Sequence, residues 1–154
     1  MTRRRTAPRH RSREVALQVL YAADLQRGGR AGEALPALAC FEGVARSFDL
    51  PEGARAFAKE LVAGTAEHGD ELDALIASHA RNWRLSRMAT VDRNILRLAG
   101  FELAHSDTPT SVVIDEAIEL ARRFGSDDSP AFVNGVLDAV ARAVRAGEPE
   151  GSAP

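Results

Sequence analysis

The segment TPTSVVIDEAIELARRFGSDDSPAFVNGVLDAVARAVRA, residues 108–146, predicts two consecutive helices. Thr108-Pro109 and Ser129-Pro130 each place an N-cap residue before a proline, a common way for a helix to begin. Gly125 is expected to end the first helix, and Gly147 with Pro149 the second. In the second helix apolar residues recur every three or four positions, which places them on one face. They are Val133, Val136, Leu137, Val140 and Val144.

The same periodicity predicts helices in residues 12–26, 33–48, 52–80 and 88–104. Ser12 is expected to cap the first of these, and Gly28-Gly29 to end it. Its apolar face consists of Ala16, Val19, Leu20 and Ala23.

Four further positions mark helix starts or breaks in the middle of the chain. Pro36 is expected near the start of the helix in 33–48, and Pro51 breaks the chain after it. Gly64 and Gly69 weaken the long region 52–80 and predict that it bends or splits.

The predicted fold class is therefore all-α, as a single compact domain of six to seven helices. Of the 154 residues, 45% are hydrophobic and 27% charged, which is typical of a soluble globular protein. No apolar run is long enough to cross a membrane, and no signal segment follows the basic N-terminus. The single Cys40 excludes a disulfide framework. We therefore expect a cytoplasmic protein.

The charge is distributed unevenly along the chain. Residues 1–13 hold six of the 20 basic residues and no acid, which leaves 14 basic and 22 acidic residues and a net charge of −8 for the rest. A basic arm on an acidic body is typical of a tail that seeks anions, although a disordered, solubilising terminus has the same composition. We expect a flexible basic arm at 1–8, a folded domain at 9–146 and a disordered tail at 147–154.

The sequence lacks the motifs of the common catalytic and metal sites. The four histidines do not form an HExxH motif, and Gly28-Gly29 follows a helix, where a phosphate-binding loop is not expected. We therefore predict no enzyme activity, no cofactor and no metal.

Two features indicate binding instead. Arg11 and Arg13 continue into the first predicted helix, which would hold their charges in place. Phe132 lies at the flank of a core stripe, as does Tyr21, and an exposed aromatic ring can stack on an unpaired base. Aromatic residues beside a core stripe are more often packed, so both interpretations stay open.

These segments resemble the NusB family of bacterial transcription antitermination factors. The resemblance is most specific in VVIDEAIELARRFGSDDSPAFVNGVLD, residues 112–138, with FVNGVLD at 132–138. RHRSREVALQVLYAADLQ at 9–26 resembles the arginine-rich start of the family, and MATVDRNILRLAGFEL at 88–103 resembles its middle. Residues 28–50 match weakly.

The resemblance implies an all-helical, non-catalytic protein that binds single-stranded boxA RNA of ribosomal RNA leaders together with NusE, a small-subunit ribosomal protein. The pair would join NusA and NusG on RNA polymerase. The implied RNA-binding residues are Arg9, Arg11, Arg13, Tyr21, Asp128 and Phe132.

On the NusE side, the resemblance implies Asp92, which as an ordinary surface acid could instead pair with Arg93 or Arg97. Two other functions stay open. One is a helical protein-interaction adaptor, and the other is the NusB-like domain of RNA cytosine methyltransferases, whose second domain would not fit in 154 residues. Both a monomer and a homodimer are compatible with the sequence.

Overall fold

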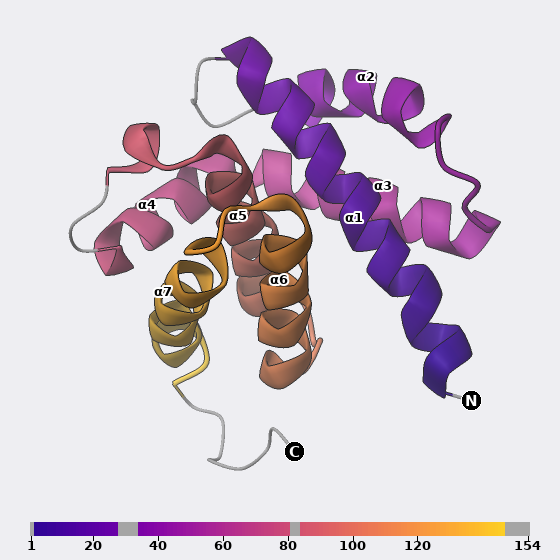
Figure 1. The fold of residues 1–154 in the computed structure, drawn as a ribbon. Coiled ribbons are helices and arrows are strands. Elements are labelled where there is room, and N and C mark those ends of the chain that lie inside the picture. Colours follow the sequence, from indigo (N-terminus) through magenta and orange to yellow (C-terminus); the bar gives the residue numbers. More distant parts are fainter. Residues whose placement is uncertain (1, 28–33, 81–83, 147–154) are drawn as a thin grey trace. The chain divides into compact units, whose positions relative to one another are not determined.

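The computed structural model describes residues 2–27, 34–80 and 84–146, and within these it contains seven α-helices, one 3-10 helix and no strand (Figure 1). The predicted all-α class is confirmed. No helix in these residues is both long and apolar enough to span a membrane. The helices are α1 (Thr2–Arg27), α2 (Ala34–Ala45), α3 (Glu52–Glu67), α4 (Gly69–His79), η1 (Leu85–Arg87, 3-10), α5 (Thr90–His105), α6 (Thr110–Phe124) and α7 (Ser129–Val144).

The helices form two units, Met1–Gly69 and Asp70–Pro154. In the first unit, α1, α2 and α3 all pack against one another (Figure 1). The predicted apolar face of α1 is confirmed as buried, because its residues recur at the helical period and remove their side chains from water together. The buried residues of α2 and α3 include Phe41, Leu61 and Val62.

The predicted start of the first helix is wrong. Helix α1 begins at Thr2, so Ser12 lies inside it and is not its N-cap. Ser12 is instead fully buried, and its hydroxyl donates a 2.8 Å hydrogen bond to the carbonyl oxygen of Ala54 in α3. The helix ends at Arg27; Gly28 and Gly29 lie outside the described residues.

The long helical region predicted at 52–80 splits at His68. Helix α3 follows Pro51 and ends at Glu67, and α4 begins at Gly69, so the second of the two candidate glycines marks the break. Pro36 is the third residue of α2, as expected for a proline near a helix start.

In the second unit, α5, α6 and α7 pack against one another in all three pairs. The core stripe of α7 is confirmed for Val133, Val136, Leu137 and Val140, whereas Val144 is half-buried. Helix α6 begins at Thr110 with Pro109 as its N-cap, so the N-cap lies one residue later than the predicted Thr108. Helix α7 begins at Ser129 with Asp128 as its N-cap, so Ser129 does not take that role.

Arginine side chains organise the polar interior of this unit. Arg97 on α5 forms a two-point ion pair with Asp73 on α4, with N–O distances of 2.7 and 3.0 Å. Arg93 donates to the carbonyl oxygens of Leu85 and Met88 at 2.9 and 3.2 Å. These contacts tie η1 and α4 to α5, and they satisfy charges that would be costly to bury alone.

Arg145 follows α7 and closes the C-terminal end of α5. Its guanidinium donates to four carbonyl oxygens and one hydroxyl, at 2.7 to 3.1 Å. The acceptors are the carbonyls of Glu102, Leu103, Ser106 and Thr108 and the hydroxyl of Thr110. The last carbonyls of a helix lack partners within the helix, so this side chain acts as a distant cap.

Candidate nucleic-acid interface

Two of the predicted RNA-binding arginines on α1 share one aromatic ring. The guanidinium carbon of Arg9 lies 5.0 Å from the ring centroid of Phe57 on α3, and that of Arg13 lies 5.4 Å from it. Both distances fall within the range of a cation–π interaction. Arg9 is exposed, whereas Arg13 keeps 4% of its surface accessible. The pair therefore presents one accessible charge, from Arg9, and one covered charge.

Arg11 lies on a different side of α1. At about 100° per residue, Arg11 is about 160° around the helix from both Arg9 and Arg13. Its side chain is exposed, in agreement with that position. Arg9 and Arg11 are thus the arginines of this set that an RNA phosphate can reach directly.

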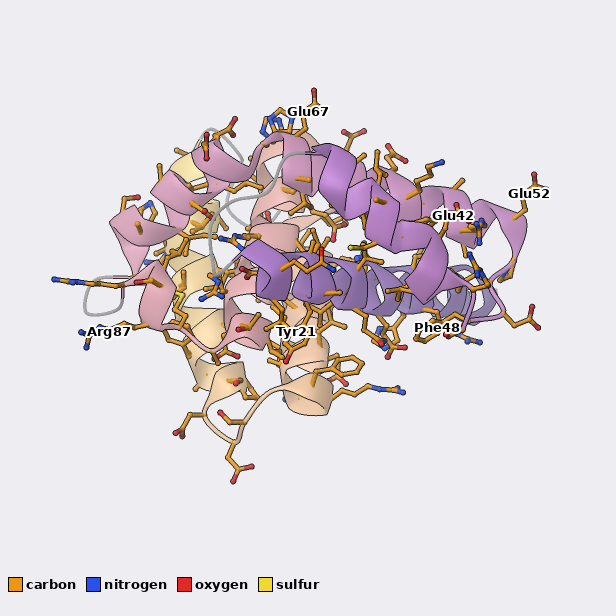
Figure 2. All side chains as sticks on the ribbon, turned by 90° about the horizontal axis from the view of Figure 1, so that it is seen from above. Tyr21, Glu42, Phe48, Glu52, Glu67 and Arg87 are labelled. Carbon is orange, nitrogen blue, oxygen red and sulfur yellow. The ribbon has the colours of Figure 1, made fainter. Side chains whose placement is uncertain are left out.

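Tyr21 is also on α1 and is 36% exposed (Figure 2). It lies about 80° around the helix from both Arg11 and Arg13, and about 12 Å along the axis from Arg13. An accessible phenol ring at this position offers a face for a base, beside the side of α1 that exposes Arg11.

Buried acids on the same helix escaped the sequence analysis. Glu14 and Asp24 keep 6% and 3% of their surface accessible. The imidazole of His10 lies 3.2 Å from the Glu14 carboxylate one turn away. The i, i+4 spacing of His10 and Glu14 was the available signal, but burial of an acid depends on what packs over it and could not be predicted from spacing.

The two predicted residues of the second unit lie at the start of α7. Asp128 is exposed and Phe132 is half-buried, and the backbone amide of Phe132 donates to the carbonyl oxygen of Asp128 at 3.1 Å. The preceding loop is tied to the helix because the amide of Ser126 donates to the Ser129 hydroxyl at 3.0 Å. Gly125 completes the turn: a Cβ there would lie 2.5 Å from the Ser129 hydroxyl oxygen, so a side chain does not fit.

The structure thus brings together Arg9 with Arg13, and Asp128 with Phe132. The first pair belongs to the first unit with Arg11 and Tyr21, and the second pair belongs to the second unit. Phe57, on which the first pair depends, was missed by the sequence analysis because it is distant in sequence from α1.

Asp92, the predicted partner-binding acid, is not an ordinary surface acid. It lies in the first turn of α5 with 9% of its surface accessible, and its Oδ1 has no hydrogen-bond partner within the described part of the chain. No ion pair of Asp92 with Arg93 or Arg97 is found within the described part of the chain, where Arg93 binds the carbonyls near η1 and Arg97 binds Asp73. The role of Asp92 toward a partner stays a prediction.

These observations describe an all-α protein with exposed arginine and aromatic side chains on its first helix. Residues 10–142 match the NusB family model. A transcription antitermination protein NusB from Anaeromyxobacter dehalogenans is 50% identical over 142 residues, which cover 92% of each chain. The protein of that name from Geobacter sulfurreducens is 46% identical over 134 residues, covering 86% of this chain and 93% of the relative.

Solved structures agree. The T. maritima NusB structure covers 95% of this chain and 93% of its own, with a TM-score of 0.76 and 33% identity. A structure of antitermination factors NusB and NusE in complex with dsRNA covers 89% of this chain and 98% of the matched chain, with a TM-score of 0.75 and 31% identity.

The chain belongs to the NusB family of transcription antitermination proteins. The family is non-enzymatic, so its assignment supports the prediction that the chain is not an enzyme.

Proposed function

We propose that this chain binds boxA-type RNA of ribosomal RNA leader transcripts together with NusE, and that the pair joins NusA and NusG on RNA polymerase. The observation that carries the proposal is the surface of α1, where Arg9, Arg11 and Tyr21 are accessible on one continuous helix. The solved relative bound to NusE and dsRNA supports it. This function belongs to the cytoplasm, where bacterial transcription takes place.

The residue types on α1 suit a single RNA strand. A guanidinium can bind a phosphate through two parallel hydrogen bonds. Unpaired bases are recognised by stacking and by contacts to their edges. Arg9 and Arg11 would supply the phosphate contacts and Tyr21 the stacking face, with Phe132 as a second ring and Asp128 as an acceptor for base amino groups. Arg13, which is covered, would contribute through the field of its charge.

The charge of the remaining chain favours a basic partner. Outside residues 1–13 the net charge is −8, which complements a basic ribosomal protein. An acidic body also weakens binding to RNA alone, so a partner that holds the same strand would raise the affinity by keeping the RNA at a high local concentration.

The direct test is the affinity for a labelled boxA RNA and for a scrambled RNA, each with and without NusE, at several salt concentrations. We expect the chain to prefer boxA and to bind it more tightly with NusE. Arg11→Ala should weaken binding and lower the salt slope by about 0.7, the value for one lost phosphate contact on a single strand. Arg142→Ala is the matched control, because Arg142 is an exposed arginine near the end of α7 and outside the proposed surface.

Other outcomes would favour the other functions. Equal binding of the two RNAs, or none with NusE present, would contradict the proposal and favour a protein-interaction adaptor. Light scattering during gel filtration, with and without NusE, decides between a monomer and a homodimer. It also shows whether NusE binds one copy of the chain.

A further inference from the structure

We propose that Phe57 is a positioning residue of the RNA-binding surface, so that α3 contributes to RNA recognition together with α1. This inference rests on the proposed function. The observation behind it is the shared ring: the guanidinium groups of Arg9 and Arg13 lie 5.0 and 5.4 Å from the centroid of Phe57.

The rotation of α1 on α3 brings these side chains to the ring. The hydroxyl of Ser12 donates to the carbonyl oxygen of Ala54, one turn before Phe57 on α3. On α1, Arg9, Ser12 and Arg13 lie within an arc of about 100°. The same face of α1 therefore holds the buried hydrogen bond and both guanidinium groups, and the hydrogen bond fixes which arginines meet the ring.

Holding Arg9 against a ring reduces the conformational entropy that its side chain loses when RNA binds. A free arginine side chain populates many rotamers, and it loses much of that freedom when it contacts a phosphate. Stacking on Phe57 removes part of that freedom before RNA arrives, and preorganisation of this kind raises affinity. A guanidinium carries five N–H donors, so that of Arg9, with its carbon 5.0 Å from the ring centroid, keeps donors for a phosphate.

Arg13 strengthens the arrangement from the covered side. It keeps 4% of its surface accessible, and its charge lies against the same ring as that of Arg9. Because Arg13 is covered and lies against the ring, it helps to hold the ring in place for Arg9.

The test is a double-mutant cycle between Phe57 and Arg9, measured as the affinity for boxA RNA with NusE present. Phe57→Leu keeps an apolar side chain and removes the ring face, and we expect about three- to tenfold weaker binding. Phe57→Tyr keeps the face and should stay within about twofold of the unchanged protein. Arg9→Ala should cost at least about threefold less affinity in the Phe57→Leu background than alone.

Two comparisons separate positioning from a general effect on the fold. Phe48→Leu is the matched control, because Phe48 is another half-buried phenylalanine of the first unit (Figure 2), and no arginine stacks on it in the described part of the chain. Arg9→Lys leaves the helix interior untouched. It keeps the charge but stacks less well and binds phosphate at one point, so we expect it to lose affinity as well.

Independent costs of Arg9→Ala and Phe57→Leu would overturn the inference, because they would mean that the ring supports only the fold. Tighter binding by Phe57→Leu would also overturn it, since the ring would then hold Arg9 away from RNA. In both cases the unchanged protein still binds boxA. Failure of the unchanged protein to bind boxA with NusE would instead contradict the proposed function itself.

Discussion

The Nε atom of Arg145 donates a 2.9 Å hydrogen bond to the carbonyl oxygen of Leu103, which joins the residue after α7 to the last turn of α5. The two residues are 42 positions apart, and four more hydrogen bonds from the same guanidinium accompany this one. We predict that Arg145→Ala lowers the free energy of unfolding by about 2–3 kcal/mol, because several carbonyls of a helix end lose a charged donor at once. Chemical denaturation measures this change.

The control for Arg145 is Arg142→Ala. Arg142 pairs with Asp138 at 2.9 Å, but both side chains are exposed, so the loss should stay below about 0.5 kcal/mol. Equal stability losses in the two variants would mean that the hydrogen bonds of Arg145 contribute no more than a surface ion pair.

Gly125 and Gly135 should respond in opposite ways to alanine. A Cβ at Gly125 would lie 2.5 Å from the Ser129 hydroxyl oxygen and 2.8 Å from the carbonyl oxygen of Ala121, whereas one at Gly135 meets nothing within 4 Å. Gly125→Ala should therefore destabilise by about 1–3 kcal/mol, as overpacking does. Gly135→Ala, inside α7, should stabilise by about 0.5–1 kcal/mol. Melting temperatures of the two variants compare these effects, and equal signs would contradict the steric argument.

Asp92 is buried, so its role toward a partner is best tested with a conservative substitution. Arginine at this buried site would overpack the start of α5 and destabilise the fold. Asp92→Asn keeps the shape and removes the charge. We expect it to unfold at the same temperature or higher, since Oδ1 has no partner among the described residues, and to bind NusE about tenfold more weakly. Calorimetric titration with unchanged NusE affinity would remove Asp92 from the interface.

Substitution of Phe132 distinguishes a role in packing from a role in RNA recognition. Its ring is half-buried, so Phe132→Ala should cost less stability than the roughly 3–5 kcal/mol of a fully buried phenylalanine. If the ring stacks on one base, the same change should cost about 1–3 kcal/mol of RNA binding. Phe101→Ala is the control, because Phe101 is also half-buried in this unit and its ring stacks on His105 at 5.7 Å. A stability loss with unchanged boxA affinity would leave Phe132 with a packing role alone.

Much of the fold could be predicted because helical periodicity is local. The stripes of α1 and α7 follow from spacing within one helix, and the break near Gly69 follows from a residue that disfavours helix interiors. Helix starts were less reliable. Ser12 has the side chain of an N-cap, but tertiary packing recruits its hydroxyl for Ala54 instead.

The same distinction between local pattern and distant contacts applies to the candidate site. Tyr21 could be placed on the first helix from the sequence, and it is exposed there; that the helix begins early enough to include Arg9 and Arg11 came from the structure. That Arg13 is covered, that Phe57 lies beside it and that Asp92 is buried all depend on contacts between distant segments. Periodicity carries no information about such contacts.

The hydrogen bond from Ser12 to Ala54 also fixes the rotation of α1 about its own axis relative to α3. Inserting one residue between Ser12 and Tyr21 would turn everything on one side of the insertion by about 100° and shift it by about 1.5 Å relative to the other side. Because Ser12 stays bound to α3, Tyr21 and the buried stripe residues after the insertion would then face the wrong directions. Residues added before Thr2 would leave this rotation of α1 unchanged. The spacing between Ser12 and Tyr21 is thus constrained by this one hydrogen bond.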